Sequence, residues 1–472
     1  MTLFLPETVL LVVAVILCSL TLTKNAIREN TLFALMTTAG VAVLGASLYS
    51  VQPWGDLFFG TYRVDLLSQG FKIMLSFAFL FAILLSKNMI SISSTRRIEY
   101  YIFLTSAMLG MMMITSAVDV LTLYVSLELS SYSLYLVAAM RQGTRNAESS
   151  AKYLFFGAAA SGFFLWGLSL VTGLAGSTSL VEITKNIPAL AAQPAFLVGL
   201  FFVSLSLLFK LSGFPMHFWA PDVYESAATP AVAFIATASK GAAVALLIRI
   251  LTATGVPHAF MLILVVLAFA SMTLGNAVAL VQQDVKRLLA YSSIAQAGYI
   301  LVGLLAGTPE GYSSSFFYAF AYILMNTGAF LATLLVAKSM NNDNPQILHF
   351  DGLAERSPFL SLVLLLSLLS LAGIPPLVGF TGKWILFSAA MDKGHWFLVL
   401  WGVLNSVVSL FYYLTIIKRV YLEKPKNPEP IRLPFHLQCL GLFLFVTIVF
   451  LGIFPDFLIT LAQKAIDLSR LA

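Results

Sequence analysis

Four ionisable side chains lie deep inside long apolar segments, where they could take up and release protons. Glu128 lies in LYVSLELSSYSLYL, Lys210 comes directly before LSGFP, Lys240 lies in FIATASKGAAVALL, and Lys383 lies in GFTGKWILF. A charge at the middle of a bilayer costs about 2.5–3.5 kcal/mol or more, so each group needs a partner or a function. Burial favours the neutral form, and a lysine, unlike an arginine, can then lose its proton near neutral pH. The pattern predicts a row of proton-relaying groups.

Other polar residues in these segments are weaker candidates. His217 lies beyond Pro215 and could link Lys210 to Lys240, although a lone histidine is more often structural. Lys72 lies about two turns into its segment, and we expect its chain to reach the interface by snorkelling. Further side chains that could polarise water are Tyr299, Tyr322 and Asn326. The alternative for the whole set is that these groups are inward-facing structural ions.

The composition indicates what kind of protein positions these groups. Of the 472 residues 59% are hydrophobic and 10% are charged, with a mean hydropathy of +0.92. Soluble domains carry about 25% charged residues, so we expect an all-α, polytopic membrane protein. The net charge of +6 does not indicate nucleic-acid binding.

The first apolar run lacks a basic start and a cleavage site, so we interpret it as a span and not a signal peptide. Cys18 and Cys439 are expected to be buried thiols.

About fourteen spans are predicted from runs of roughly 20 apolar residues. Their limits are 5–23, 31–50, 65–86, 100–117, 118–140, 153–175, 194–213, 229–250, 258–281, 288–306, 314–337, 359–390, 395–417 and 434–460. The seventh is interrupted at LSGFP and the twelfth at LAGIP, because glycine and proline break a helix. We therefore expect discontinuous helices at spans 7 and 12.

The lysines and arginines outside the spans predict the orientation. Connections that run from an odd to an even span hold most of them, including Lys24, Arg28, Arg96, Arg97, Lys286, Arg287, Lys418, Arg419 and Lys426. Cytoplasmic loops are enriched in basic residues, so these connections are expected to face the cytoplasm and both termini to face outward.

The two interrupted spans also predict an internal repeat. They lie five spans apart, and an odd offset reverses the direction through the membrane. We expect two inverted five-helix units, spans 4–8 and 9–13, because paired breaks of this kind mark transport sites. A single membrane domain would then contain residues 1–99, a first unit at 100–250, a second at 258–420, and a last span at 434–460. In this alignment Lys210 corresponds to Ser370.

Longer motifs resemble a known family. FKLSGFPMHFWAPDVYESAATPAVAF, DVKRLLAYSSIAQAGY and LAGIPPLVGFTGKW are similar to the signatures of the antiporter-like subunits of respiratory complex I. Met216 and Ser226 replace the usual phenylalanine and glycine. Two features favour the subunit N branch, which is called subunit 2 in mitochondria. Lys383 stands where subunit M has a glutamate. The chain also stops after span 14, where subunit L continues.

The resemblance implies roles for the charged groups. Glu128 and Lys210 would form a gating pair at the cytoplasmic half-channel, Lys240 would be the central relay, and Lys383 the terminal site toward the outside. His217 remains a candidate link. The subunit itself would bind no cofactor and no metal, while NADH, FMN, iron–sulfur clusters and quinone would bind elsewhere in the complex.

The resemblance also implies an assembly in the bacterial inner membrane, with both termini on the periplasmic side. Expected partners are subunit M, the small subunit K, the lateral helix of subunit L and lipid, but no nucleic acid. The rival functions are a subunit of a multi-subunit sodium/proton antiporter, of an energy-converting hydrogenase or of a related quinone oxidoreductase. A structural membrane scaffold is the alternative of another class.

Overall fold

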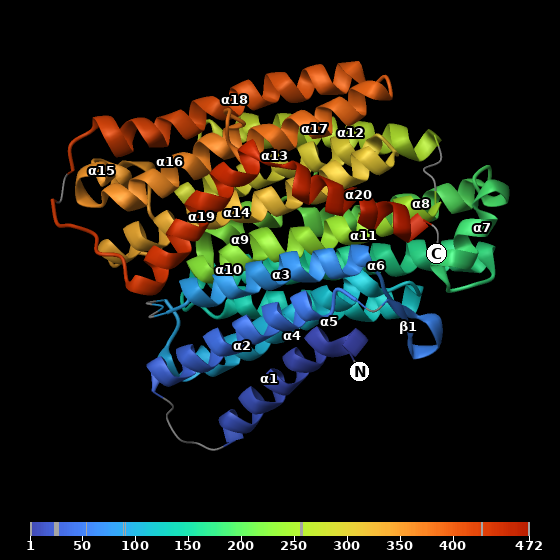
Figure 1. The fold of residues 1–472 in the computed structure, drawn as a ribbon, viewed down its shortest axis with the longest axis horizontal. Helices are drawn as coiled ribbons and strands as arrows, with labels where there is room; N and C mark the ends of the chain where they lie inside the picture. The colour runs from blue at the N-terminus through green and yellow to red at the C-terminus, as the bar shows by residue number, and fades with distance from the viewer. Residues whose placement is uncertain are drawn as a thin grey trace.

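A computed structural model describes residues 2–470 apart from 23–27, 53, 88, 90, 255–257 and 426–427. Its long helices lie side by side, with their axes close to the long axis of the view in Figure 1. Within the described residues, thirteen segments are long and apolar enough to cross a membrane. The predicted all-α, polytopic architecture is confirmed. Lys24 and Lys426, which entered the prediction of orientation, lie outside the described residues.

The first part of the chain contains η1 (Thr2–Phe4), α1 (Leu5–Leu22), α2 (Glu29–Tyr49), β1 (Gly55–Leu57), η2 (Phe58–Gly60), β2 (Tyr62–Val64), α3 (Leu66–Leu85) and η3 (Ser94–Arg96). The second part contains α4 (Arg97–Ser116), α5 (Val120–Ala139), α6 (Thr144–Ala175), α7 (Leu180–Leu190), α8 (Pro194–Leu211), α9 (Trp219–Ser226), α10 (Thr229–Phe234), the π-helix η4 (Ile235–Ser239) and α11 (Lys240–Thr254). The third part contains α12 (His258–Ala279), α13 (Val285–Leu305), α14 (Pro309–Ser339), η5 (Ile347–Phe350), α15 (Leu353–Arg356), α16 (Pro358–Ala372), α17 (Val378–Asp392), α18 (Trp396–Leu422), α19 (Phe435–Ile453) and α20 (Asp456–Arg470).

The predicted twelfth span is present as two shorter helices, α16 and α17, which the thirteen segments do not include. Several short elements outside the predicted spans were not expected from the sequence, among them the antiparallel β1–β2 hairpin, the short helices α7 and α15, and α20. The last predicted span ends earlier than expected, at Ile453. Pro455 lacks the amide hydrogen that a continuing helix would need, and α20 begins after it.

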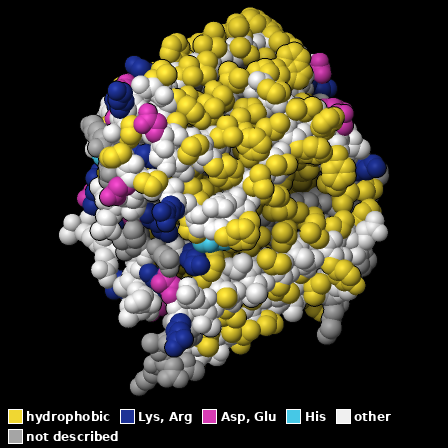
Figure 2. Space-filling model, turned by 60° about the vertical axis from the view of Figure 1, so that its left-hand side comes forward, with side chains coloured by type: hydrophobic (Ala, Val, Ile, Leu, Met, Phe, Trp, Pro, Cys, Tyr) yellow, Lys and Arg dark blue, Asp and Glu magenta, His cyan; other side chains and the backbone are white. Residues whose placement is uncertain are grey.

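Burial separates inner helices from outer ones. The most apolar windows of α13 and α14 are 94% buried, and that of the segment containing α11 is 100% buried, whereas those of α1 and α6 are only 28% buried. The lysine at the start of α11 is therefore held at the centre of the bundle. The outer helices present apolar side chains, and Figure 2 shows a broad hydrophobic surface with charged side chains gathered mainly toward its left edge.

The two cysteines belong to the outer surface. Cys18 on α1 and Cys439 on α19 are both exposed, so the expectation of buried thiols is wrong. The apolar runs correctly predicted that both cysteines lie in membrane spans. Composition alone does not show which side of an outer helix faces lipid and which faces the protein interior.

Both interrupted spans end their first helix in the same way. Ser212 after α8 has φ 54° and Gly373 after α16 has φ 92°, both in the left-handed region. The next amide group donates five residues back, from Gly213 to the Leu208 carbonyl and from Ile374 to the Leu369 carbonyl. This is the capping pattern that closes a helix C-terminus.

The left-handed residues correct the alignment of the two breaks. Because Ser212 corresponds to Gly373, the breaks are one residue out of step with the sequence motifs. Lys210 then corresponds to Leu371, and not to Ser370 as the motifs indicated. The inverted relation between the two five-helix units remains a prediction.

We predict that Gly373→Ala lowers the stability of the protein more than the same substitution at another glycine with a left-handed backbone. A Cβ at Gly373 would lie 3.2 Å from Lys383 Cδ, and the left-handed backbone costs a further 1–2 kcal/mol or so. Gly394→Ala is the matched control, because Gly394 has φ +80° and nothing lies within 4 Å of its added Cβ. Thermal unfolding of the purified complex compares the two, and equal losses would show that the Lys383 contact contributes nothing.

Candidate functional site

Glu128 and Lys210 lie on adjacent elements but do not form the predicted ion pair. Lys210, on the last turn of α8, is 8% exposed and donates from Nζ to Ser130 Oγ of α5 at 3.1 Å. Glu128, half-buried on the same helix, accepts a hydrogen bond from Ser161 Oγ of α6 at 2.6 Å. Glu128 and Ser130 are two residues apart on α5, so the carboxylate lies close to the ammonium group. The two groups are therefore near neighbours with serine hydroxyls as their direct partners.

Lys240 lies at the centre of the bundle, directly after a π-helical turn. It is 2% exposed, and its Nζ donates to the Ser293 carbonyl of α13 at 2.7 Å. The ring of Tyr322 on α14 lies 5.8 Å from the same atom. The π-helix over Ile235–Ser239 widens the turn before the lysine, and such turns are frequent at functional sites.

Lys383 reaches back from α17 to the end of the broken helix α16. Its Nζ donates to the carbonyls of Leu371 and Ala372, each at 3.1 Å, and lies 4.4 Å from the centroid of the Tyr299 ring. The last carbonyls of a helix lack partners and carry the negative end of its dipole, so they favour an ammonium group. The second break thus offers two helix-end carbonyls to Lys383.

A polar connection runs from Lys240 to Lys383 along α13. Gln296, one turn after Ser293, donates from Nε2 to the Leu371 carbonyl at 3.2 Å. The same carbonyl accepts from Lys383 Nζ. Gln296 Oε1 in turn accepts a short hydrogen bond from Tyr318 OH of α14. Two of the three lysines are thus linked to the same turn of α13, Lys240 through the Ser293 carbonyl and Lys383 through the acceptor that it shares with Gln296.

Gln296→Leu should interrupt this connection. The leucine keeps the volume but leaves the Tyr318 hydroxyl without its acceptor and the Leu371 carbonyl without one donor. We expect slower NADH-driven proton translocation in an assembled complex. Gln282→Leu serves as the control, because within the described residues the Gln282 amide donates only to the nearby Val278 carbonyl. Equal rates for the two variants would remove Gln296 from the pathway.

His217 does not connect the lysines in this structure. It is 4% exposed, its ring lies between those of Phe214 and Phe218, and within the described residues its Nδ1 has no hydrogen-bond partner. No hydrogen bond joins it to Lys210 or Lys240 in the described part of the chain. Its relay role stays a prediction.

Lys72 does not snorkel, and that interpretation is wrong. Its side chain is 0% exposed and its Nζ lies 2.8 Å from Glu7 Oε1, on a carboxylate that is also 0% exposed. Tyr62 OH donates to the same oxygen at 2.7 Å. Burial, then the Glu7 carboxylate, raises the pKa of Tyr62 well above its usual value, so the tyrosine stays a donor. The sequence hid this pair because Glu7 lies in the first turn of its helix, where a carboxylate is ordinary.

A second buried ion pair lies beside Glu7–Lys72. Arg249 donates to both carboxylate oxygens of Asp65 at 2.9 Å and also to the Thr115 carbonyl. Burial acts to raise the pKa of Asp65, but the Arg249 guanidinium and the hydrogen bonds from Ser68 together hold that pKa below its usual value. Bidentate pairing of this kind fixes α11 to the start of α3.

The carboxylates of the PDVYE motif are held in an ion-pair network. Asp222 accepts from Lys152 and Arg287, each at 3.0 Å, and Glu225 accepts from Arg287 at 3.0 Å and pairs with Arg145. These contacts join α9 to α6 and α13. The network positions the segment after the first break.

Sequence reasoning missed Ser293 and Gln296, although a signal was present. In SSIAQAGY the polar residues Ser292, Ser293, Gln296 and Tyr299 recur at helical spacing within an apolar span. Such a stripe marks an inward-facing polar side of a helix. The partner of each residue depends on how α13, α14 and α16 pack.

The chain is similar to proteins of one family. A family model described as NADH:quinone oxidoreductase/Mrp antiporter, TM, matches residues 117–409. NADH-quinone oxidoreductase subunit N 2 of Syntrophobacter fumaroxidans is 42% identical over 467 residues, which cover 98% of each chain. The family match contains all five predicted site residues and begins after Glu7 and Lys72.

Solved structures give the same picture. A chain of respiratory complex I from Thermus thermophilus with bound aureothin matches with a TM-score of 0.84 and 32% identity, over 98% of this chain and 100% of that one. A chain of the Mrp complex from Dietzia matches with a TM-score of 0.88 but 19% identity, over 99% and 97% of the two chains. The second likeness concerns the fold alone.

Proposed function

Because the chain belongs to the family of NADH-quinone oxidoreductase subunit N, we propose that it is the antiporter-like membrane subunit that moves protons while NADH reduces quinone elsewhere in the complex. The observation that carries this proposal is the connection between two buried lysines. Lys240 bonds to Ser293, and Gln296, one turn away, shares the Leu371 carbonyl with Lys383. A structural scaffold has no need for ammonium groups joined in this way.

Each lysine has a distinct task in the proposed path. Lys210 accepts a proton from the cytoplasmic half-channel, with Glu128 setting the electrostatic field around it. Lys240 passes the proton along α13, and Lys383 releases it on the other side. Movement of Lys210 from Ser130 toward Glu128 would create the predicted gating pair, and the two groups would then titrate as a unit. Loss of that contact would drive the proton onward.

The proposed role is that of a non-redox subunit in a translocating enzyme. We propose that this chain binds no cofactor or metal of its own, and that NADH, FMN, iron–sulfur clusters and quinone belong to other subunits. Its proposed neighbours are subunits M and K and the lateral helix of subunit L. The partly exposed carboxylate of Glu128 on α5 supports a protein neighbour there, because the hydrogen bond from Ser161 leaves part of a charge uncovered inside a membrane span.

We also propose the bacterial inner membrane as the location, with both termini outward. The start of α1 and the end of α20 lie at the same end of the bundle, as Figure 1 shows. The basic connections support the cytoplasmic assignment of the opposite end.

Ion selectivity separates this proposal from the antiporter alternative. Inverted vesicles that contain the complex are given NADH, and internal acidification is followed with a pH-sensitive dye in sodium-free medium. We expect acidification that a protonophore abolishes and that added sodium leaves unchanged. Proton movement that requires sodium, or sodium uptake coupled to NADH oxidation, would favour the sodium/proton antiporter.

A further inference from the structure

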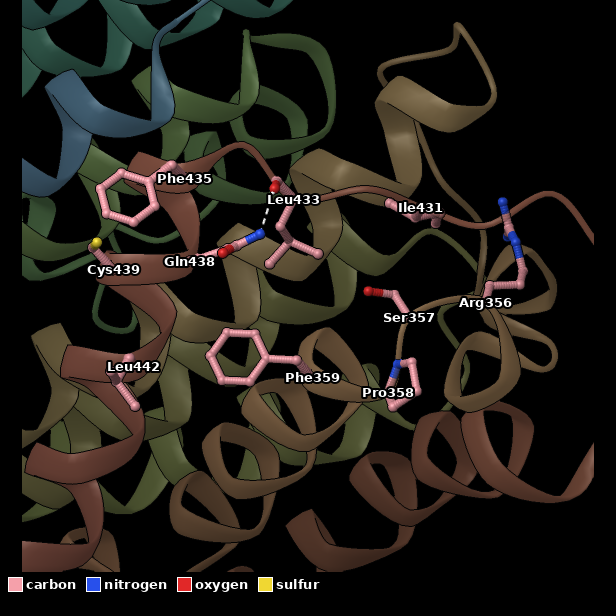
Figure 3. Close-up of a pocket in the computed structure, with 10 residues that line it drawn as sticks. All are labelled: Arg356, Ser357, Pro358, Phe359, Ile431, Leu433, Phe435, Gln438, Cys439 and Leu442. Atoms are coloured by element: carbon pink, nitrogen blue, oxygen red, sulfur yellow. Dashed lines mark hydrogen bonds between the residues drawn. The ribbon is translucent and has the colours of Figure 1, made fainter.

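A pocket opens on the side of the bundle between the start of α16 and the first turns of α19. Its volume is about 590 Å³. Figure 3 shows Phe359 and Ser357 facing Gln438 across it, with Leu433 and Ile431 along one edge. It lies at the end of the bundle where α15 is found, opposite the chain termini (Figure 1). It shares no residue with the lysine pathway.

One end of the pocket is built for an anion. Arg356 is 8% exposed, and its Nε and Nη2 donate to the Glu429 carbonyl and Ser339 Oγ, each at 3.2 Å. Ser357 is 5% exposed, its hydroxyl points into the pocket in Figure 3, and it has no hydrogen-bond partner within the described residues. Pro358, the first residue of α16, has no amide hydrogen, so the amide groups of Phe359 and Leu360 are the ones at this end that lack partners inside the helix.

The other end of the pocket is apolar and open to the side. Phe359 forms its floor, and Phe435, Cys439 and Leu442 of α19 form its wall. Leu442 is 55% exposed and Phe435 is 79% exposed, on an outer helix of the bundle. No acidic side chain lines the pocket within the described residues, although Glu429 acts on Arg356 from outside it.

We propose that this pocket binds an anionic membrane phospholipid, with its phosphate at Arg356 and Ser357 and an acyl chain along Phe359 and Leu442. The charge is complementary, because a guanidinium, a free hydroxyl and a helix N-terminus all favour a phosphate. The polarity is also complementary, because the apolar wall continues from the charged end along a membrane-crossing helix. A free phosphate ion matches only the first half of the site, and a neutral quinone matches only the second.

The two cysteines provide a direct test in the intact complex. Cys439 lines the pocket and Cys18 lies on α1, and both are exposed. Delipidated complex in detergent is treated with N-ethylmaleimide after addition of phosphatidylglycerol, phosphatidylcholine or glycerol phosphate, and modification of each peptide is followed by mass spectrometry. We expect phosphatidylglycerol to slow labelling of Cys439 several-fold, with little effect of the other two additives and none at Cys18.

Other outcomes would overturn the proposal. Equal protection by phosphatidylcholine would remove the phosphate-end selectivity, and protection by glycerol phosphate would indicate a free anion site. A Cys439 that stays unreactive in the delipidated complex would mean that a protein neighbour covers the pocket.

Two variants sharpen the test. Arg356→Gln should abolish the difference between the two lipids. Leu442→Trp should fill the apolar end and remove protection by phosphatidylglycerol, whereas Val446→Trp, which is 51% exposed on the same helix outside the pocket, should retain it. If the Arg356→Gln complex does not assemble, the comparison of Leu442→Trp with Val446→Trp still tests the proposal. Full protection in Leu442→Trp would contradict the assigned position of the acyl chain.

Discussion

Lys383→Met is expected to slow proton transfer through this chain by about 100-fold or more, the scale on which a positioned proton-transfer group contributes. Lys383 donates to the Leu371 and Ala372 carbonyls at the end of α16. Methionine has a similar length and an apolar chain, but its thioether carries no proton. The measurement is NADH-driven acidification of vesicles, with complex assembly checked on a native gel.

Lys393→Met is the matched control for this prediction. Lys393 lies just after the same helix α17 and is exposed, so its loss removes a charge without touching the pathway. Proton translocation in Lys393→Met should equal that of the unaltered complex. Equal translocation in both variants would exclude Lys383 from the proton path.

The second large effect concerns the Glu7–Lys72 pair and is one of stability. Glu7→Gln or Lys72→Met alone should destabilise the subunit by about 3–5 kcal/mol, because each leaves an uncompensated charge in a fully buried site. The double variant should recover most of that loss, since neither charge remains. Thermal unfolding of the purified complex, with all four chains compared in a double-mutant cycle, measures the coupling.

An exposed pair nearby calibrates this result. Asp56 pairs with Arg63 at 3.0 Å with side-chain exposures of 45% and 18%, so Asp56→Asn should cost only about 0–1 kcal/mol. If Glu7→Gln costs no more than Asp56→Asn, the buried pair does not hold α1 and α3 together.

The membrane class, the order of the spans and the presence of lysines within them could be predicted from the sequence. Each of these features depends on how a residue differs from its neighbours in the chain. A lysine such as Lys240 is conspicuous within an apolar run, and a glycine and proline such as those in LSGFP interrupt a helix wherever it packs. The helix breaks at α8 and α16 were therefore visible without knowing any tertiary contact.

The partners of these groups could not be predicted, because they come from helices far apart in the chain. Ser130 takes the place expected for Glu128 beside Lys210, and Glu7 reaches Lys72 across two helices. The one-residue offset between the breaks is a further example. Both motifs place glycine at the same position, yet Ser212 adopts the left-handed conformation in the first break and Gly373 does so in the second.

We propose that Lys240 relays protons between the two halves of the path. The most direct test is NADH-driven proton pumping by vesicles that carry the Lys240→Ala complex, compared with the unaltered complex at equal assembly. The alanine removes the ammonium group that bonds to the Ser293 carbonyl, so pumping through this chain should be lost. Full pumping by an assembled Lys240→Ala complex would exclude Lys240 from the proton path.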